Sequence, residues 1–200
     1  MEWLTSGVGN WEIRLVGDGG FSEREQAGIA ELLRGLVADG AALGWVDPPP
    51  AEEVRELLGD LAVGIAGGDT AVAIAVAFIG GETGGEVAGF GYWRRYSRPT
   101  HRPHADLEKL AVDPGRQGAG LGRALLSALI AAAFDGQVEV LTLDLRGDNV
   151  RAAGLYEKLG FHQYGRLENF VAVGPARYDK LLYALDLREL RGPAEVPVSC

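Results

Sequence analysis

Cysteine is almost absent from this chain of 200 residues, and its scarcity excludes two kinds of site. The one cysteine, Cys200, is the last residue, so the chain can form neither an internal disulfide framework nor a thiolate metal site. The three histidines, His101, His104 and His162, lack the spacing of a metal-ligand set. The sequence therefore predicts a protein without a bound metal.

Basic charge and long apolar runs are also scarce. The net charge is −9, which argues against nucleic acid as the main partner, because a phosphate backbone requires a basic protein face. The most apolar run, residues 71–79, is too short to span a membrane. No basic segment followed by an apolar run marks a signal peptide. We therefore expect a cytoplasmic protein with neither a nucleic-acid nor a membrane partner.

Glycine, in contrast, is abundant: the chain has 30 glycines, many of which lie between segments with an alternating or a helical pattern of apolar residues. The length suits one domain with a substantial core. Period-2 patterns predict strands at 11–16, 70–79, 86–96, 104–112, 138–145, 161–173 and 177–187. Helical stripes predict helices at 22–39, at 50–58, from 120 onward, and at 149–159. This order of elements indicates an α+β fold with a mixed sheet.

The stretch 106–123, D-L-E-K-L-A-V-D-P-G-R-Q-G-A-G-L-G-R, organises the rest of the chain. A strand runs into a turn, a loop of glycines and the N-terminus of a helix. Strict alternation would place on one strand face Asp106, Glu108, Leu110 and Val112, and on the other Leu107, Lys109 and Ala111. The amide groups of such a loop and helix N-terminus converge on a point that suits a phosphate.

Two motifs carry a resemblance to a known family. The spacing Gln117-x-x-Gly120-x-Gly122 differs from both dinucleotide and P-loop patterns, and it resembles the Q/R-x-x-G-x-G/A loop of the GNAT family of N-acetyltransferases. The segment 149–161, N-V-R-A-A-G-L-Y-E-K-L-G-F, resembles the family's N-x-x-A-x-x-L-Y-x-K-x-G-F at every fixed position. The alternative, an ordinary glycine turn, explains the loop alone but not both motifs in the family's order.

The resemblance implies a mixed, mostly antiparallel central sheet, flanked by helices and splayed at an acetyl-CoA site. Residues 1–190 would form one N-acetyltransferase domain. Within it, 11–61 would form the first strand and the substrate-side helices, 70–160 the acetyl-CoA-binding core, and 161–187 the closing strands. We expect residues from 191 onward to be a disordered tail.

The resemblance also implies which residues hold acetyl-CoA. In the family, loop amides hold the pyrophosphate and strand amides face the pantetheine arm. Carried over residue by residue, the coenzyme-binding set is Leu110, Ala111, Val112, Gln117, Gly118, Ala119, Gly120, Leu121, Gly122, Arg123, Asn149, Ala152 and Tyr156. Arg116 either reaches a phosphate or is solvated.

Tyr156 is the candidate proton donor to the leaving sulfur, a role that a tyrosine at this place has in the family. The alternative is a core tyrosine packed beside Ala152 and Leu159. Three carboxylates are candidates for attracting the amine and taking its proton, because an amine is protonated at neutral pH. These are Asp106, Glu108 and Asp144. Each has a plain alternative: solvation or ion pairing for the first two, and capping of the turn at Gly147 for the third.

The acceptor is the open question, because the fold determines the donor rather than the acceptor. A weaker resemblance to small antibiotic- and tabtoxin-resistance acetyltransferases implies a small primary amine: an amino acid, a polyamine or an antibiotic. The alternatives are a protein lysine or N-terminal acetyltransferase, and an inactive acyl-CoA-binding sensor. A homodimer is a further expectation, because dimers are common in such families. Four aromatic residues could line an acceptor pocket or belong to the core: Phe90, Tyr92, Trp93 and Tyr96.

Overall fold

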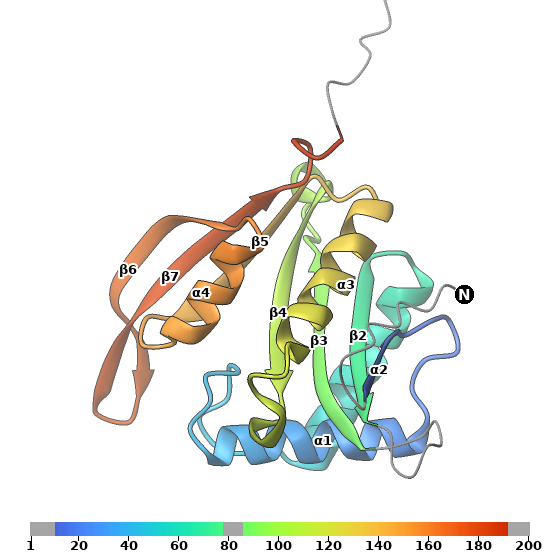
Figure 1. Cartoon of the computed structure of the whole chain (residues 1–200), viewed down its shortest axis with the longest axis vertical. Coiled ribbons are helices and arrows are strands. Elements are labelled where there is room, and N and C mark those ends of the chain that lie inside the picture. Colours follow the sequence, from blue (N-terminus) through green and yellow to red (C-terminus); the bar gives the residue numbers. More distant parts are fainter. Residues whose placement is uncertain (1–10, 78–85, 192–200) are drawn as a thin grey trace, which may run out of the picture.

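A seven-stranded sheet forms the centre of the computed structural model, which describes residues 11–77 and 86–191 (Figure 1). The strands lie in the order β1-β2-β3-β4-β5-β7-β6. Their bounds are β1 Trp11–Leu15, β2 Thr70–Ala77, β3 Val87–Arg95, β4 His104–Val112, β5 Val140–Arg146, β6 His162–Val173 and β7 Ala176–Asp186. Every pair of neighbours is antiparallel except β4 and β5. The expected mixed, mostly antiparallel α+β architecture is confirmed.

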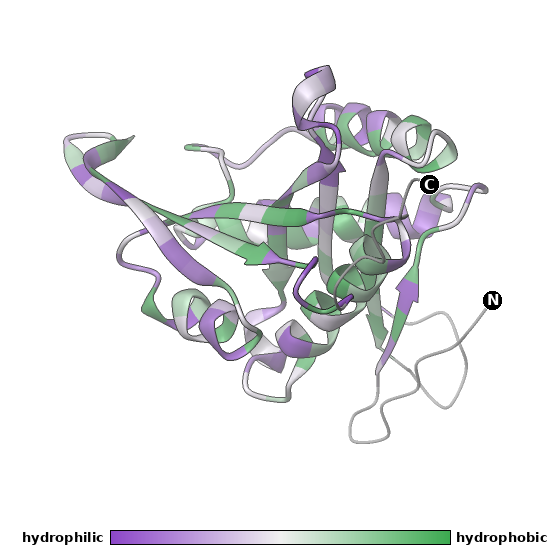
Figure 2. Ribbon diagram, turned by 90° about the horizontal axis from the view of Figure 1, so that it is seen from above, coloured by the Kyte–Doolittle hydropathy of each residue, from purple (hydrophilic) through white to green (hydrophobic). Residues whose placement is uncertain are grey.

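Helices cover both faces of this sheet. One face packs against α1, Glu23–Ala38, and α2, Ala51–Ala66, and the other against α3, Leu121–Asp135, and α4, Val150–Lys158. Each layer buries its own cluster of aliphatic and aromatic side chains against the strands. Figure 2 shows the β6–β7 hairpin extending away from these layers. None of the described helices is long and apolar enough to cross a membrane.

Local signals in the sequence account for most helix ends. Ser22 caps α1 and forms a capping box with Glu25, in agreement with the helix start expected at residue 22. Helix α2 follows Pro50, as expected, but extends to Ala66 rather than ending near residue 58. The buried stripe of α2 continues to Leu61, and the helix stops only where glycines follow. Three parts of the expected organisation lie outside the described residues: residues 1–10 of the domain, the end of the strand expected at 70–79, and all but the first residue of the tail expected from 191 onward.

The one parallel contact, between β4 and β5, is short. Only residues 104–106 pair with residues 140–142, after which β5 continues along β7 alone. The C-terminal half of β4 therefore has no β5 partner, and the two strands diverge. The expected splay in the sheet is at this position.

A β-bulge in β4 changes which side chains share a face. The register with β3 shifts by one residue between Phe90 and Tyr92, so that Lys109 and Leu110 together oppose a single residue. Lys109 has a φ of 50°, in the left-handed region. The extra residue reverses the alternation of side chains in the rest of the strand.

The expectation that Glu108, Leu110 and Val112 share one face is therefore wrong. Leu110 and Val112 pack with Leu107 in the core beneath α3, whereas Ala111 packs in the core beneath α1 and α2. Sequence alternation alone cannot reveal this reversal, because one inserted residue inverts every position after it.

Candidate active site

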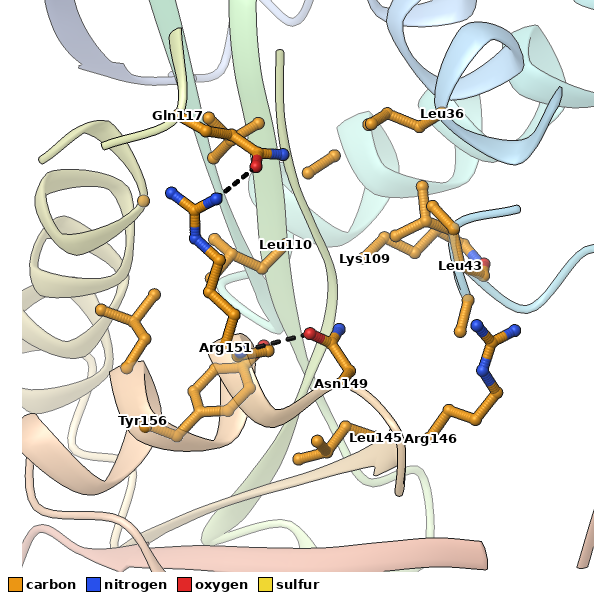
Figure 3. A pocket seen from close by; sticks show the side chains of 18 of the residues that line it. Leu36, Leu43, Lys109, Leu110, Gln117, Leu145, Arg146, Asn149, Arg151 and Tyr156 are labelled. Atoms are coloured by element: carbon orange, nitrogen blue, oxygen red, sulfur yellow. Dashed lines mark hydrogen bonds between the residues drawn. The ribbon is translucent and has the colours of Figure 1, made fainter. Parts of the chain in front are cut away.

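A cavity of about 1130 Å³ lies where β4 and β5 diverge (Figure 3). On one side of the sheet its walls are the N-terminus of α3 and the helix α4. On the other side its wall is the loop 39–44 between α1 and α2. The cavity therefore passes through the gap between the two strands. It joins two sites of opposite character, one rich in amides and arginines and one rich in carboxylates.

The glycine loop borders the first of these sites. Gly118 and Gly120 have φ values of 92° and 83°, and Gly120 is the N-cap of α3 without a side-chain cap. A Cβ atom added at either position would meet no atom within 4 Å, so the backbone is open to the cavity. The first amides of α3 and its dipole favour an anion here. These residues fit the diphosphate of a coenzyme.

All but one of the expected coenzyme-binding residues line the cavity. The exception is Ala119, which is exposed between the two glycines and is not part of the wall. Arg123, in the first turn of α3, adds a positive charge to the wall. Asn149 caps α4 by accepting a hydrogen bond from the Ala152 amide at 3.2 Å, which leaves the side-chain NH₂ group of Asn149 as a donor.

Arg151 lies on the same side of the cavity and was missed in the sequence. Its guanidinium donates to Oε1 of Gln117 at 2.5 Å and so joins α4 to the glycine loop (Figure 3). Arg151 occupies a variable position of the second motif, so no sequence signal separates it from other surface arginines. Only the fold brings it next to Gln117.

Tyr156 lies in the middle of the cavity wall and is only 7% exposed. Its ring packs edge-on against Phe161, with the ring centroids 5.7 Å apart. Burial, and secondarily the charge of Asp144, raises the pKa of the Tyr156 hydroxyl above its ordinary value. The hydroxyl therefore keeps its proton at neutral pH. The residue is both a core side chain and a neutral donor beside the strand gap.

Asp106 lies at the point where β4 and β5 separate. Its carboxylate accepts a hydrogen bond from Thr142, whose Oγ1 is 2.6 Å from the Tyr96 hydroxyl. Burial, strengthened by the charges of Glu108 and Asp144, raises the pKa of Asp106 to about 6, although the hydrogen bonds act in the opposite direction. Asp106 can therefore exchange a proton near neutral pH.

The other two carboxylates also line the cavity. Glu108 accepts a hydrogen bond from the Tyr92 hydroxyl at 2.9 Å. Asp144 forms an ion pair with Lys180, at 2.9 Å between Oδ1 and Nζ. The idea that Asp144 caps the turn at Gly147 is wrong, because the Gly147 amide donates to the Asp179 carbonyl at 2.8 Å.

Lys109 is the second residue that the sequence analysis missed. From the bulge, its ammonium group donates to the Leu43 carbonyl at 2.9 Å and lies 3.9 Å from the centre of the Trp45 ring. Burial lowers the pKa of this lysine. A left-handed backbone costs a residue other than glycine about 1–2 kcal/mol, so these contacts offset a local strain.

Several other candidates lie outside the cavity wall. Arg116 forms ion pairs with Asp113 and Glu86. Phe90, Tyr92 and Trp93 are core residues, at most 2% exposed, and among the aromatic candidates only Tyr96 contacts Asp106. The histidines lie apart from the cavity. Within residues 11–77 and 86–191, no group of three histidine, cysteine or carboxylate side chains could hold a metal ion.

Residues 47–161 match the model of the acetyltransferase (GNAT) family. The [ribosomal protein bS18]-alanine N-acetyltransferase of Escherichia coli strain K12 is 40% identical over 83 residues, which are 42% of this chain and 56% of that protein. A mycothiol acetyltransferase of Propionibacterium freudenreichii is 34% identical over 94 residues, 47% of this chain and 30% of that protein. The alignments thus span from about a third to about half of these relatives.

The fold also occurs in solved structures. A phosphinothricin acetyltransferase of the GNAT superfamily from Sinorhizobium meliloti, in complex with acetyl-CoA, superposes with a TM-score of 0.72. The match covers 88% of each chain at 18% identity. At this identity the likeness establishes the shared fold alone, and it confirms the expected architecture.

Proposed function

Since this chain belongs to the GNAT acetyltransferase family, we propose that it transfers an acetyl group from acetyl-CoA to a primary amine. One observation carries the proposal. The glycine loop at the N-terminus of α3, the half of β4 that has no β5 partner and Tyr156 all border the same cavity. Acetyl-CoA, when bound, supplies an acetyl group activated as a thioester.

On the coenzyme side, the residues have separate tasks. The amides from Gly118 to Gly122, with Arg123, hold the diphosphate. Arg151, which lies beside the loop on α4, adds a second positive charge next to it. Asn149 and the free edge of β4 hold the amide groups of the pantetheine arm. Main-chain N–H groups between Leu110 and Val112 stabilise the charge that develops on the carbonyl oxygen.

On the acceptor side, the residues move protons. Asp106, with its raised pKa, receives a proton from the incoming amine, directly or through water, while Glu108 and Asp144 attract the cation. A carbon–nitrogen bond forms and the carbon–sulfur bond breaks. Tyr156 holds a proton at its hydroxyl oxygen, where the departing sulfur can take it.

Two classes of acceptor fit this site. Small primary amines, such as an amino acid, a polyamine or an antibiotic, suit a cavity with a carboxylate-rich end. The fold is also shared with a phosphinothricin acetyltransferase. The α-amino group of a protein is the second candidate, and the specific observation in its favour is the 40% identity to the E. coli enzyme named for ribosomal protein alanine.

The experiment combines coenzyme binding with thiol release. Thermal shift with coenzyme A and acetyl-CoA tests the donor site. Thiol release is then measured with alaninamide, spermidine, phosphinothricin and a hexapeptide that begins with alanine. Turnover of the small amines supports the first acceptor class, and preference for the peptide supports the second. Tight coenzyme binding without any turnover would contradict catalysis and support a sensor.

A further inference from the structure

The side chain of Lys109, in the strand next to the gap, contacts the loop between α1 and α2. Residues 39–44 of this loop line the acceptor end of the cavity. Backbone hydrogen bonds from the amides of residues 39–41 hold the start of the loop to the end of α1, whereas beyond residue 41 the Leu43 amide donates only to the Ala41 carbonyl. Gly40 and Gly44 have φ values of 84° and 86°. The conformation of residues 42–45 therefore depends on contacts from other elements, which include the packing of the Leu43 and Trp45 side chains against the core beneath α1 and α2.

The polar contact to this segment from the sheet comes from Lys109, which approaches from the bulge in β4. Its Nζ donates to the Leu43 carbonyl at 2.9 Å and lies over the Trp45 ring. Trp45 in turn donates from its indole nitrogen to Glu53 of α2 at 2.6 Å. A continuous set of contacts therefore runs from β4 through the loop to α2.

A second cation reaches the same loop from β5. Nη2 of Arg146 is 3.4 Å from the Gly40 carbonyl, while Nε and the same Nη2 donate to the carboxylate of Asp148. Lys109 and Arg146 thus approach the loop from the two strands that diverge (Figure 3). The Lys109 contact is the shorter of the two and is combined with a cation–π contact, so it is the dominant one.

We propose that Lys109 is a positioning residue, whose ammonium group fixes the 39–45 loop across the gap between β4 and β5 and thereby shapes the acceptor end of the cavity. The proposal rests on the proposed function, because it assigns this end to the amine. The left-handed backbone at residue 109 supports it. Glycine would adopt that φ without strain, yet the chain places there a long cationic side chain with two partners on the loop.

The test compares Lys109→Met, which keeps the length and loses the charge, with Lys109→Arg, which keeps a cation. Arg34→Met, at an exposed position of α1, controls for loss of charge elsewhere. Hydrogen–deuterium exchange of residues 39–45 reports the loop directly. Titration with coenzyme A gives the dissociation constant of the donor site. Acceptor KM is measured with alaninamide and with the alanine-initiated hexapeptide, at saturating acetyl-CoA.

We expect Lys109→Met to speed exchange in the loop and to raise the acceptor KM about tenfold, because the variant loses one part-buried charge-assisted hydrogen bond and one cation–π contact. Affinity for coenzyme A should stay within about twofold, because the loop lies at the other end of the cavity. Lys109→Arg should restore most of the acceptor KM, and Arg34→Met should match the wild type.

If hydrogen–deuterium exchange in the loop were unchanged in Lys109→Met, the claim that Lys109 fixes the loop would be wrong. Faster exchange with an unchanged acceptor KM, or with weakened coenzyme binding, would overturn the assignment of the loop to the acceptor end. Failure of the proposed function has a different signature. The wild-type protein would then bind no coenzyme A or acetylate neither probe, while the exchange comparison would still decide whether Lys109 fixes the loop.

Discussion

Asp106 of β4 and Thr142 of β5 form the last residue pair before the two strands diverge, and the Thr142 hydroxyl donates a hydrogen bond to the Asp106 carboxylate. The pair thus marks the apex of the gap in the sheet. It also places a carboxylate with a raised pKa at the end of the cavity that we assign to the amine. The residue at which the sheet opens is therefore also the residue that we propose as the base.

The first prediction concerns the pH dependence of turnover. Because the pKa of Asp106 is about 6, kcat/KM for the wild type should fall as pH drops through that value. Asp106→Asn should lower kcat/KM by about 10²-fold at pH 7.5 and remove this acidic limb. The hydrogen bond from Thr142 lowers the pKa of Asp106 in the wild type. Thr142→Val removes this bond, so it should raise the pKa of Asp106 and move the limb to higher pH. An unchanged limb in Asp106→Asn would assign the base to another group.

The second prediction concerns stability: Asp106→Asn, which should lower activity, should make the fold more stable at pH 7.5. The folded-state pKa of Asp106, about 6, lies above its ordinary value of 3.8. The stabilisation from its protonation is therefore fully present below pH 3.8 and is lost as pH rises through 6. At pH 7.5 the buried charge destabilises the fold, so Asp106→Asn should raise the free energy of unfolding by about 2 kcal/mol.

Urea denaturation at pH 7.5 and at pH 4 measures this effect. The advantage of Asp106→Asn should shrink strongly at pH 4, because the wild-type carboxyl is then almost fully protonated in the folded state and the buried charge is gone. Destabilisation of equal size at both pH values would mean that the hydrogen bond from Thr142 outweighs the burial of the charge.

The third prediction concerns Tyr156. Replacing it with phenylalanine keeps the packing against Phe161 and removes the proton donor. We expect kcat to fall by about 10²-fold with a much smaller rise in KM for acetyl-CoA. Steady-state kinetics with acetyl-CoA as the varied substrate separates the two constants. A large change in KM alone would show that the hydroxyl anchors the coenzyme instead.

The fourth prediction concerns the glycine loop. Gly120→Asp should abolish binding of coenzyme A, because it places a side chain and a negative charge at the N-terminus of α3. Gly174→Asp, in the β6–β7 turn, is the matched control, since that glycine also has a positive φ and open space around it. Isothermal titration should show normal affinity for the control only. Normal affinity of Gly120→Asp for coenzyme A would contradict the assignment of the diphosphate to this loop.

Much of the fold could be predicted because its signals are local. Ser22 and Glu25 mark the start of α1, Gly120 marks the start of α3, and Asn149 caps α4 as a short polar residue at that place should. Two motifs at fixed spacing then identified the family. Each of these signals lies within a few consecutive residues, so it can be recognised in the sequence without knowledge of the fold.

The acceptor end could not be predicted, because it depends on contacts between distant residues. The bulge at Lys109 leaves no mark in the alternation of the strand, and it reverses the side chains that follow. The contact between Lys109 and Leu43 joins residues 66 positions apart. Arg151 and Gln117 are separated by 34 positions, and only the packing of α4 beside α3 brings them together.

The most direct test of the central claim is a crystal structure of the protein with coenzyme A. We expect the diphosphate on the amides between Gly118 and Gly122, and the sulfur in the gap between β4 and β5, near the Tyr156 hydroxyl. A diphosphate bound elsewhere, or a pantetheine arm that does not enter the gap, would contradict the account.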